Sequence, residues 1–331
     1  MHLRWQSLTL RLIHPFQIAH GVSDTRENVL VSVDGGVGEA AAVPYHGETP
    51  EGIIQYLRGL QLEQVADPLQ LEDLLAGLPA GSAAARAGVD MALHDAWGRA
   101  LGQPLYRLFG LNPARIPPSS FTIPIGPLDQ LAQRVREADA AIFKLKLGDD
   151  ADAERVAALR ALTSAPLRVD VNGGWTRERA EQLLPLLAEH GVELVEQPLP
   201  AGDLEGLARL SRLRSRPPIF VDESIKSSAD LLAHRGLVEG VVIKLAKSGG
   251  IRGAREQIAL ARALGQQVML GCMIESSVAV TAAAHLAPLA QYVDLDGPLL
   301  IQNDPFRGFR YERGRIELPE RPGLGLLANA D

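Results

Sequence analysis

The sequence contains one cysteine, Cys272, and no long apolar run. A single cysteine allows neither a disulfide framework nor a thiolate metal site, as is typical of a protein of the reducing cytoplasm. No segment approaches the ~20 consecutive apolar residues that a membrane-spanning helix needs. The segment MHLRWQSLTLRLIH interleaves polar and apolar residues and lacks the apolar core of a signal peptide. These absences predict a cytoplasmic protein that spans no membrane.

Basic residues are fewer than acidic ones. The chain has 33 Lys and Arg against 40 Asp and Glu, a formal net charge of −7 and a pI of about 5.7. With no basic run and no low-complexity tract, this balance argues against binding to nucleic acid or to an anionic membrane. A chain of 331 residues with 46% apolar content fits one large globular domain with a smaller one. We therefore expect neither nucleic acid nor a membrane as a partner, and the composition leaves a homo-oligomer open.

From about residue 140 onward, one pattern recurs along the chain. A short β-rich run is followed by a polar or glycine turn and then by an Ala/Leu-rich run with apolar residues at three- and four-residue steps. Strict alternation of strand and helix indicates a parallel sheet, and seven such units are enough to close a barrel. The expected strands are 119–126, 141–148, 167–174, 192–199, 218–224, 240–250, 267–277 and 292–298.

The first third of the chain is organised differently. LRWQSLTLRL and NVLVSVDGGVGEAAA read as antiparallel strands with a turn at Gly35–Gly36, and a helix is expected over 83–102. The fold class predicted is α/β: an α+β domain over residues 1–114, then a TIM-type barrel over 115–305. Residues 306–331 read as coil and strand that return to the first domain.

Ionisable residues stand at or near the carboxyl ends of the barrel strands. Asp170 and Glu196 are separated by 26 residues, and Glu196 and Asp222 by another 26, so each acid lies one strand–helix unit after the last. The carboxyl ends of barrel strands form the mouth where active-site residues collect. The full set comprises Lys144, Lys146, Asp170, Glu196, Asp222, Lys244, Asp294 and Asp296.

These residue types predict a metal site flanked by bases. Three carboxylates without a nearby His or Cys suit Mg²⁺, and Mn²⁺ would suit the same ligands. Lys144 and Lys146 are two apart on a strand, so both ammonium groups point the same way. Crowding of one ammonium by another lowers its pKa, which would make Lys146 a base near neutral pH, with Lys244 acting from the other side. Two bases flanking a metal-bound carboxylate can remove an α-proton and return it.

Several motifs together carry a family resemblance. K-x-K in KLKLG, D-x-N in RVDVNGG, EQP in LVEQPLP, DES in FVDES and the run VIKLAKSGG resemble the enolase superfamily, and within it the muconate-lactonizing-enzyme subgroup. GVGEAA and ARAGVDMALHDAWGRALGQPLYRLFG are similar to that family's capping domain, so the resemblance covers nearly the whole chain. It implies a modified (β/α)7β barrel with an N-terminal capping domain that shapes substrate specificity.

The resemblance assigns roles by motif. Asp170, Glu196 and Asp222 would be the metal ligands. Lys146 and Lys244 would be the acid/base pair that acts through a metal-stabilised enediolate. Lys144 would tune Lys146 and neutralise substrate charge.

Other residues near these motifs receive plain structural interpretations. Lys247, taken to lie on a strand three positions after Lys244, is expected to face away from the chemistry. KSGGIRG lacks the residue order of a P-loop and reads as a strand–helix turn. His94 and His285 lie in helical runs and are interpreted as packing or surface residues, and Cys272 as an inert wall residue.

The end of the barrel narrows the reaction. LGCMIESS followed by VDLDGP resembles the dipeptide epimerases, whose D-x-D holds a substrate ammonium; here this would be Asp294 and Asp296. The resemblance implies epimerisation of an L,L-dipeptide to the L,D form. The alternative is an o-succinylbenzoate synthase, an N-acylamino-acid racemase or a cycloisomerase that uses the same site. The substrates of these enzymes lack a free α-ammonium, so they would give Asp294 and Asp296 no cation to bind. A binding or structural protein on an inherited barrel is a third hypothesis.

The cap loops give the weakest signal for the side chain that is bound. Relatives acting on Ala-Glu carry an arginine in the first cap loop, and the matching position here is Ser23, with His20 and Arg26 nearby. The second cap loop offers Tyr45 and Glu48, which suit a cationic or aromatic side chain. These residues favour a hydrophobic, mixed or cationic dipeptide over Ala-Glu.

Overall fold

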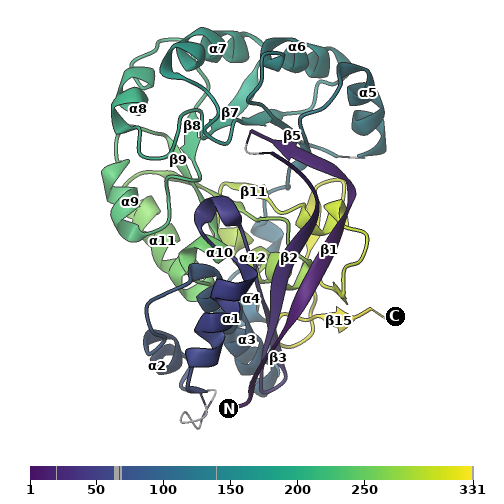
Figure 1. The fold of residues 1–331 in the computed structure, drawn as a ribbon, viewed down its shortest axis with the longest axis vertical. Coiled ribbons are helices and arrows are strands. Elements are labelled where there is room, and N and C mark those ends of the chain that lie inside the picture. The colour runs from purple at the N-terminus through teal and green to yellow at the C-terminus, as the bar shows by residue number, and fades with distance from the viewer. Residues whose placement is uncertain (20, 63–66, 68, 139, 330–331) are drawn as a thin grey trace.

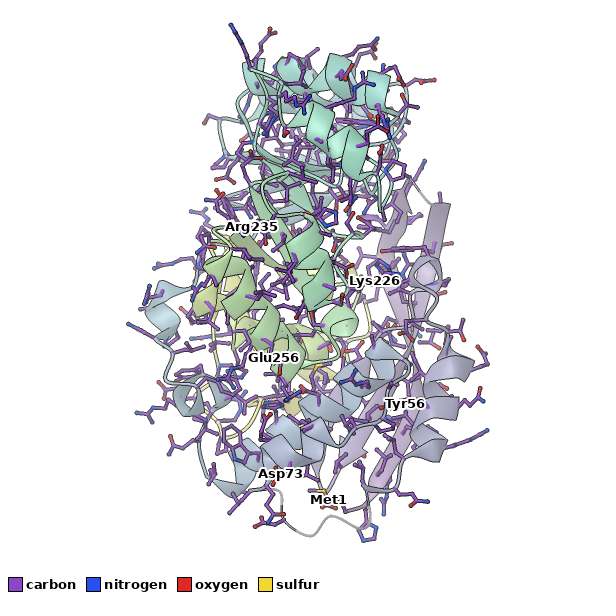
Figure 2. All side chains as sticks on the ribbon, turned by 90° about the vertical axis from the view of Figure 1, so that its left-hand side faces the viewer. Met1, Tyr56, Asp73, Lys226, Arg235 and Glu256 are labelled. Carbon is purple, nitrogen blue, oxygen red and sulfur yellow. The ribbon has the colours of Figure 1, made fainter. Side chains whose placement is uncertain are left out.

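The structure is a computed structural model that describes residues 1–19, 21–62, 67, 69–138 and 140–329. Figure 1 shows two parts: a barrel of strands surrounded by helices, and a smaller sheet with its own helices beside it. In the side view, Arg235 and Glu256 lie on the outer layer of the barrel, whereas Tyr56 and Asp73 lie on the smaller part (Figure 2). No helix of the described residues is long and apolar enough to cross a membrane.

The smaller part is built on an antiparallel sheet. Its strands are β1 (Leu3–Ile18), β2 (Gly21–Val33) and β3 (Gly36–Ala40), paired in that order. Asp34 and Gly35, both with positive φ, form the two-residue turn between β2 and β3. The expected turn at Gly35–Gly36 is therefore one residue late, because Gly36 already pairs with Val33.

Helices cover one face of this sheet. They are α1 (Pro50–Gly59), α2 (Leu71–Ala76) and α3 (Ala83–Ala100). The short helix α4 (Leu105–Leu108) follows α3, and 3₁₀ turns lie at Pro44–His46 (η1) and Pro113–Arg115 (η3). β3 lies so close to α3 that a Cβ on Gly38 would stand 2.0 Å from the carbonyl oxygen of Gly88. Small residues at this contact let the sheet and the helix form one apolar core.

The barrel consists of eight parallel strands. Their order is that of the chain, and an isolated bridge between Ser119 and Val293 joins the two edges. The strands are β4 (Phe121–Ile123), β5 (Phe143–Lys146), β6 (Leu167–Asp170), β7 (Val192–Glu196), β8 (Ile219–Val221), β9 (Gly240–Lys244), β10 (Gln267–Gly271) and β11 (Tyr292–Asp294). This arrangement confirms the predicted TIM-type barrel with an N-terminal antiparallel-sheet domain.

Helices follow the strands and cover the barrel's outer face (Figure 1). They are α5 (Leu128–Glu137), α6 (Asp152–Leu162), α7 (Arg177–Glu189), α8 (Leu204–Leu210), α9 (Ser228–Ala233), α10 (Leu245–Ser248), α11 (Ile251–Ala263) and α12 (Ser277–Ala284), with 3₁₀ turns at Ala287–Leu289 (η4) and Gly297–Leu300 (η5). After η5 the chain forms two short hairpin pairings. They are β12 (Phe306–Arg307) with β15 (Leu327–Ala328), and β13 (Arg310–Glu312) with β14 (Arg315–Glu317).

The two parts are joined through the C-terminal segment and through buried acids. The backbone N–H of Leu105 donates to the carbonyl of Gly323 at 3.1 Å. Glu39 on β3 accepts hydrogen bonds from the backbone N–H and hydroxyl of Ser276 at 3.0 and 2.5 Å, and from the side chain of Asn28. Burial raises the pKa of Glu39 despite these hydrogen bonds. These contacts fix the small sheet against the loop that leads into α12.

Candidate active site

The barrel interior changes from apolar to charged along the strands. Inward-facing side chains alternate with outward-facing ones along each strand, so residues two apart point to the same side. The lower layer is apolar: Leu194, Phe220, Val242 and Met269 pack together. At the carboxyl ends of the strands, the buried residues are Asp170, Glu196, Asp222 and Lys244. The barrel thus presents its charged layer at the carboxyl ends of the strands, as the sequence predicted.

Lys144 lies at the centre of this charged layer. Its Nζ is 3.0 Å from Asp170 Oδ2, 2.7 Å from Glu196 Oε2 and 2.7 Å from Asp294 Oδ2. Lys146 shares the same Asp170 oxygen at 2.6 Å and donates to the side-chain oxygen of Asn172 at 3.2 Å. The K-x-K pair is therefore held by carboxylates from three other strands.

Lys244 stands on the opposite side of the barrel, four strands from Lys146 in the order β5 to β9. Its Nζ lies 2.7 Å from Asp222 Oδ2. The paired position on β10 is Gly271, where a Cβ would stand 3.1 Å from Lys244 Cε and 3.1 Å from a methyl of Val242. The absence of a side chain at Gly271 gives Lys244 the space to extend into the mouth.

We expect Gly271→Ala to disturb this placement. The added methyl would press on Lys244 and on the core residue Val242, so kcat should fall roughly 10-fold or more, and the free energy of unfolding by about 1–3 kcal/mol. Steady-state kinetics and urea unfolding measure both effects. Gly59→Ala is the matched control, because nothing lies within 4 Å of a Cβ built at Gly59. Unchanged kcat in Gly271→Ala would show that Lys244 does not need this space.

Lys247 corrects the sequence interpretation. The strand expected over 240–250 ends at Lys244 in the structure, and Lys247 lies on the short helix α10. Its ammonium contacts both the carboxylate and the carbonyl oxygen of Asp222, so it belongs to the charged layer rather than facing away. A three-residue step returns to the same side on a helix but not on a strand. Gly249, with φ +75°, ends α10 and was the available signal for a helix here.

The electrostatics of the layer follow from burial and ion pairing together. Burial alone would raise the pKa of Asp170 and of Asp222, but the neighbouring lysines outweigh it and lower both. Burial and the charge of Asp170 raise the pKa of Glu196 well above its ordinary value. Burial opposes protonation of Lys144, yet the three surrounding carboxylates raise its pKa.

The pKa of Lys244 is also raised well above its ordinary value. Burial opposes protonation, but Asp222 and Glu196 outweigh it. Burial lowers the pKa of Lys247. With the carboxylates unneutralised, Lys244 is thus held as a cation, and positive charge added at the acids would lower its pKa.

The buried carboxylate oxygens are ligands that suit a hard cation, although the side chains are not arranged as a preformed metal site. Glu196 Oε1 and Glu223 Oε2 are buried oxygens without a hydrogen-bond partner among the described residues. As they stand, no three His, Cys, Asp or Glu side chains of the described residues are grouped to hold one ion. Lys144 lies between Asp170 and Glu196, so a cation would replace its ammonium at these oxygens.

Asp294 and Asp296 lie beside this layer but differ in their partners. Asp294 accepts from Ser120 Oγ at 2.6 Å and pairs with Lys144. Asp296 directly precedes η5, just after β11, and accepts the backbone N–H of Thr122 at 2.6 Å. Burial, together with the charge of Asp294, raises the pKa of Asp296 to about 6. No cationic side chain of the described residues forms an ion pair with Asp296.

A cavity of about 70 Å³ connects these groups, and we call it the chamber. Lys144, Lys146, Lys244, Asp294 and Asp296 all line it. Asp170, Glu196 and Asp222 are fully buried behind the lysines. Asn172, Cys272 and Met273 complete part of its wall.

The cap loops contribute differently from the sequence expectation. Tyr45 lines the chamber. Glu48 does not: its carboxylate accepts from Ser82 Oγ at 2.5 Å and from the backbone N–H of Ala83 at 2.8 Å, at the start of α3. Ser23 also stays outside the chamber wall, and its hydroxyl contacts Arg26. Arg26 itself lines the chamber, and His20 lies outside the described residues.

Comparison with known proteins agrees with this architecture. Residues 6–110 match the family model of the mandelate racemase / muconate lactonizing enzyme N-terminal domain, and residues 128–331 match that of the enolase C-terminal domain-like family. The chain belongs to the enolase superfamily. The L-Ala-D/L-Glu epimerases of Bacteroides thetaiotaomicron and Escherichia coli are among its relatives, and this member of the superfamily is an enzyme of the isomerase class.

Three similar proteins illustrate the range. The L-Ala-D/L-Glu epimerase of Bacteroides thetaiotaomicron is 40% identical over 328 residues, which cover 96% of this chain and 85% of that protein. The substrate-liganded L-Ala-D/L-Glu epimerase of Bacillus subtilis has a TM-score of 0.89 at 30% identity, covering 100% and 99% of the two chains. A dipeptide epimerase of Methylococcus capsulatus, complexed with Mg and L-Arg-D-Lys, has a TM-score of 0.88 at 34% identity, covering 98% and 99%.

Proposed function

We propose that this enzyme is a Mg²⁺-dependent dipeptide epimerase that converts L,L-dipeptides to the L,D form. The observation that carries the proposal is the chamber, which is lined by Lys146, by Lys244 and by Asp296, an acid that forms no ion pair among the described residues. A dipeptide has a free ammonium at one end and a carboxylate at the other, which matches these charges.

The ammonium of the substrate would bind at the aspartates. Lys144 pairs with Asp294 at 2.7 Å, whereas Asp296 forms no ion pair among the described residues and accepts hydrogen bonds from Thr122. A substrate cation would supply the missing partner in a buried, charge-assisted hydrogen bond. N-acyl and N-succinyl substrates bring no cation, so they leave the charge of Asp296 buried and unpaired. This difference favours a dipeptide over the alternative reactions.

The two lysines would divide the proton transfer between them. With the α-carbon held between β5 and β9, one lysine in its neutral form takes the α-proton, and the other, protonated, gives a proton to the opposite face. Asp170, Glu196 and Asp222 would hold Mg²⁺, and Mn²⁺ would suit the same oxygens. Bound there, the ion supplies the positive charge that makes the α-proton acidic and offsets the buried acids around the lysines.

Arg26 points to an anionic side chain on the C-terminal residue. It lines the chamber, it donates hydrogen bonds to the Ser23 hydroxyl and the carbonyl of Thr25, and burial lowers its pKa. With Glu48 turned to α3, the cationic preference expected from the sequence loses its main support. The relative from Bacteroides thetaiotaomicron, an L-Ala-D/L-Glu epimerase, supports the same choice.

We expect Arg26→Met to lower kcat/KM for L-Ala-L-Glu by about 10²-fold, as for loss of one partner of a buried ion pair. The value for L-Ala-L-Leu should stay within about threefold, because no charge is lost to that substrate. Arg4→Met, at an exposed position of β1, is the matched control. Equal losses on both substrates would contradict an anion-specific role for Arg26.

The reaction itself is tested by proton exchange. The enzyme with Mg²⁺ and a library of L,L-dipeptides in D₂O should give a one-unit mass gain for the accepted members. No gain for any dipeptide, from folded protein with Mg²⁺ present, would refute the proposal. Gain with N-succinyl or N-acyl amino acids instead would assign one of the alternative reactions.

A further inference from the structure

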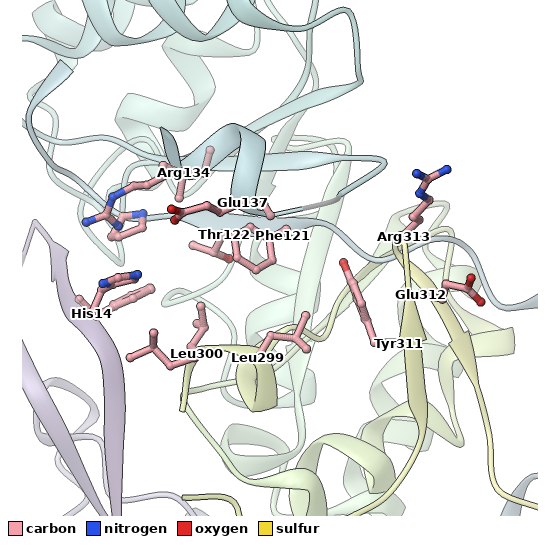
Figure 3. Close-up of a pocket in the computed structure, with 15 residues that line it drawn as sticks. His14, Phe121, Thr122, Arg134, Glu137, Leu299, Leu300, Tyr311, Glu312 and Arg313 are labelled. Atoms are coloured by element: carbon pink, nitrogen blue, oxygen red, sulfur yellow. The ribbon is translucent and has the colours of Figure 1, made fainter. Parts of the chain in front are cut away.

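A second and larger cavity adjoins the chamber. Its volume is about 490 Å³, against about 70 Å³ for the chamber. It lies between the β1 end of the cap sheet, the first barrel strand β4, helix α5, η5 and the β13–β14 hairpin. Figure 3 shows Leu299 and Leu300 facing Phe121 and Thr122 across it. We call this cavity the side cavity.

The side cavity and the chamber share part of their walls. Phe16, Thr122 and Leu300 line both. Thr122 is also the residue whose backbone N–H holds Asp296 at 2.6 Å. The two spaces therefore meet beside the carboxylate that would bind the substrate ammonium.

The chamber by itself is small for a dipeptide. Ligand sites usually measure ≈ 300–1,000 Å³, so the chamber accounts for the reacting atoms but not for two side chains. In a dipeptide, the side chain of the N-terminal residue is attached to the same carbon as the ammonium. A side chain anchored at Asp296 in this way needs open space next to Thr122, and the side cavity supplies it.

Apolar side chains make up the larger part of the side cavity's exposed lining, with charged residues beside them. Ile13, Phe16, Phe121 and Ile123 line it together with the two leucines of η5. The basic and acidic residues are His14, Arg134, Glu137, Glu312 and Arg313 (Figure 3). An apolar, preformed cavity of this size gains most from a large apolar side chain, because water leaves both surfaces on binding.

Tyr311 marks the connection between the cavity and the aspartates. Its hydroxyl is buried and has no hydrogen-bond partner among the described residues, and it points into the cavity in Figure 3. Burial, with the charges of Asp296 and Asp294, raises its pKa above the ordinary value.

We propose that the side cavity binds the side chain of the N-terminal residue and selects dipeptides in which that residue is large and apolar, such as Leu, Met or Phe. This inference rests on the proposed dipeptide epimerase function. It assigns N-terminal selectivity to β4, α5 and the β13–β14 hairpin, outside the cap loops that face the other end of the substrate.

The test compares dipeptides that share one C-terminal residue and differ at the N-terminus: Gly, Ala, Leu, Met and Phe. We expect kcat/KM for Leu, Met or Phe to exceed that for Gly by about tenfold or more. Ala138→Phe, at the end of α5 where Ala138 lines the cavity, should lower kcat/KM about tenfold for Phe and leave Gly within about twofold. Ala263→Phe, on the exposed side of α11, is the matched control.

A second variant guards against misfolding of the first. Tyr311→Phe removes a buried hydroxyl without a partner, so kcat/KM for an N-terminal Phe should rise about threefold while that for Gly stays unchanged. Equal kcat/KM for Gly and Phe, or equal effects of the cavity variants on both, would overturn the inference while leaving the epimerase function intact. Exchange with no dipeptide at all would overturn both.

Discussion

Replacing either Lys146 or Lys244 by alanine should lower the rate of epimerisation by about 10³-fold or more, because general acid–base groups contribute typically 10²–10⁴-fold each. Both transfers are needed to invert the α-carbon, so neither lysine can substitute for the other. The two side chains stand on opposite sides of the barrel, on β5 and β9. Polarimetry of an L,L-dipeptide in the presence of Mg²⁺ measures the loss.

The same two variants separate a two-base mechanism from a single base. In D₂O, each variant should still exchange the α-proton of one stereoisomer, and the two variants should retain opposite stereoisomers. Proton NMR of the L,L and L,D substrates, run separately, reads this directly. Lys226→Ala is the matched control, because Lys226 is exposed and outside the chamber. If both variants exchanged the same stereoisomer, the assignment of the lysines to opposite faces would be wrong.

Replacing Asp296 by asparagine should lower kcat/KM for dipeptides by about 10²-fold or more, as expected when one partner of a buried, hydrogen-bonded charge pair is removed. The side-chain oxygen of asparagine still accepts the N–H of Thr122, so the loss reports the ammonium rather than the fold. Asp34→Asn, at the β2–β3 turn far from the mouth, serves as control. Full activity of Asp296→Asn on its best substrate would instead support one of the reactions whose substrates lack an ammonium.

The same substitution should make the protein more stable at pH 8. The pKa of Asp296 rises from 3.8 to about 6 on folding, so the folded state keeps a proton that the unfolded state has lost between those values. Ionisation of Asp296 therefore removes stability as the pH rises from about 4 to above 6, by about 3 kcal/mol in full. Asparagine does not ionise, so unfolding of Asp296→Asn by urea should show the gain at pH 8 and little difference at pH 4.

The shift of Asp296 also predicts the acid side of the activity profile. Below about pH 6 the carboxylate of the free enzyme takes up a proton and no longer attracts an ammonium, so kcat/KM for dipeptides should fall with decreasing pH. A profile without a step near this pH would indicate that Asp296 is not the group that binds the ammonium.

The sequence by itself determined the barrel and most of its charged layer. Strand residues alternate with a period of two, and strand–helix units repeat at a nearly constant length, so residues 26 apart, such as Asp170 and Glu196, arrive at the same level of neighbouring strands. The positions of Lys144, Lys146 and Lys244 follow from the same local rule. The β2–β3 turn was placed within one residue, because Asp34 and Gly35 carry a strong local turn signal.

Only the tertiary structure decided where the longer or loop-borne side chains go. Thr122 holds Asp296 across the closing edge of the barrel, 174 residues away in sequence. Glu48 turns to the start of α3, and Arg26 reaches the chamber where Ser23 was expected. Lys247 joins the acids because the chain becomes helical one residue after Lys244. The direction of such side chains depends on which distant segments pack against them, and no local period in the sequence encodes that.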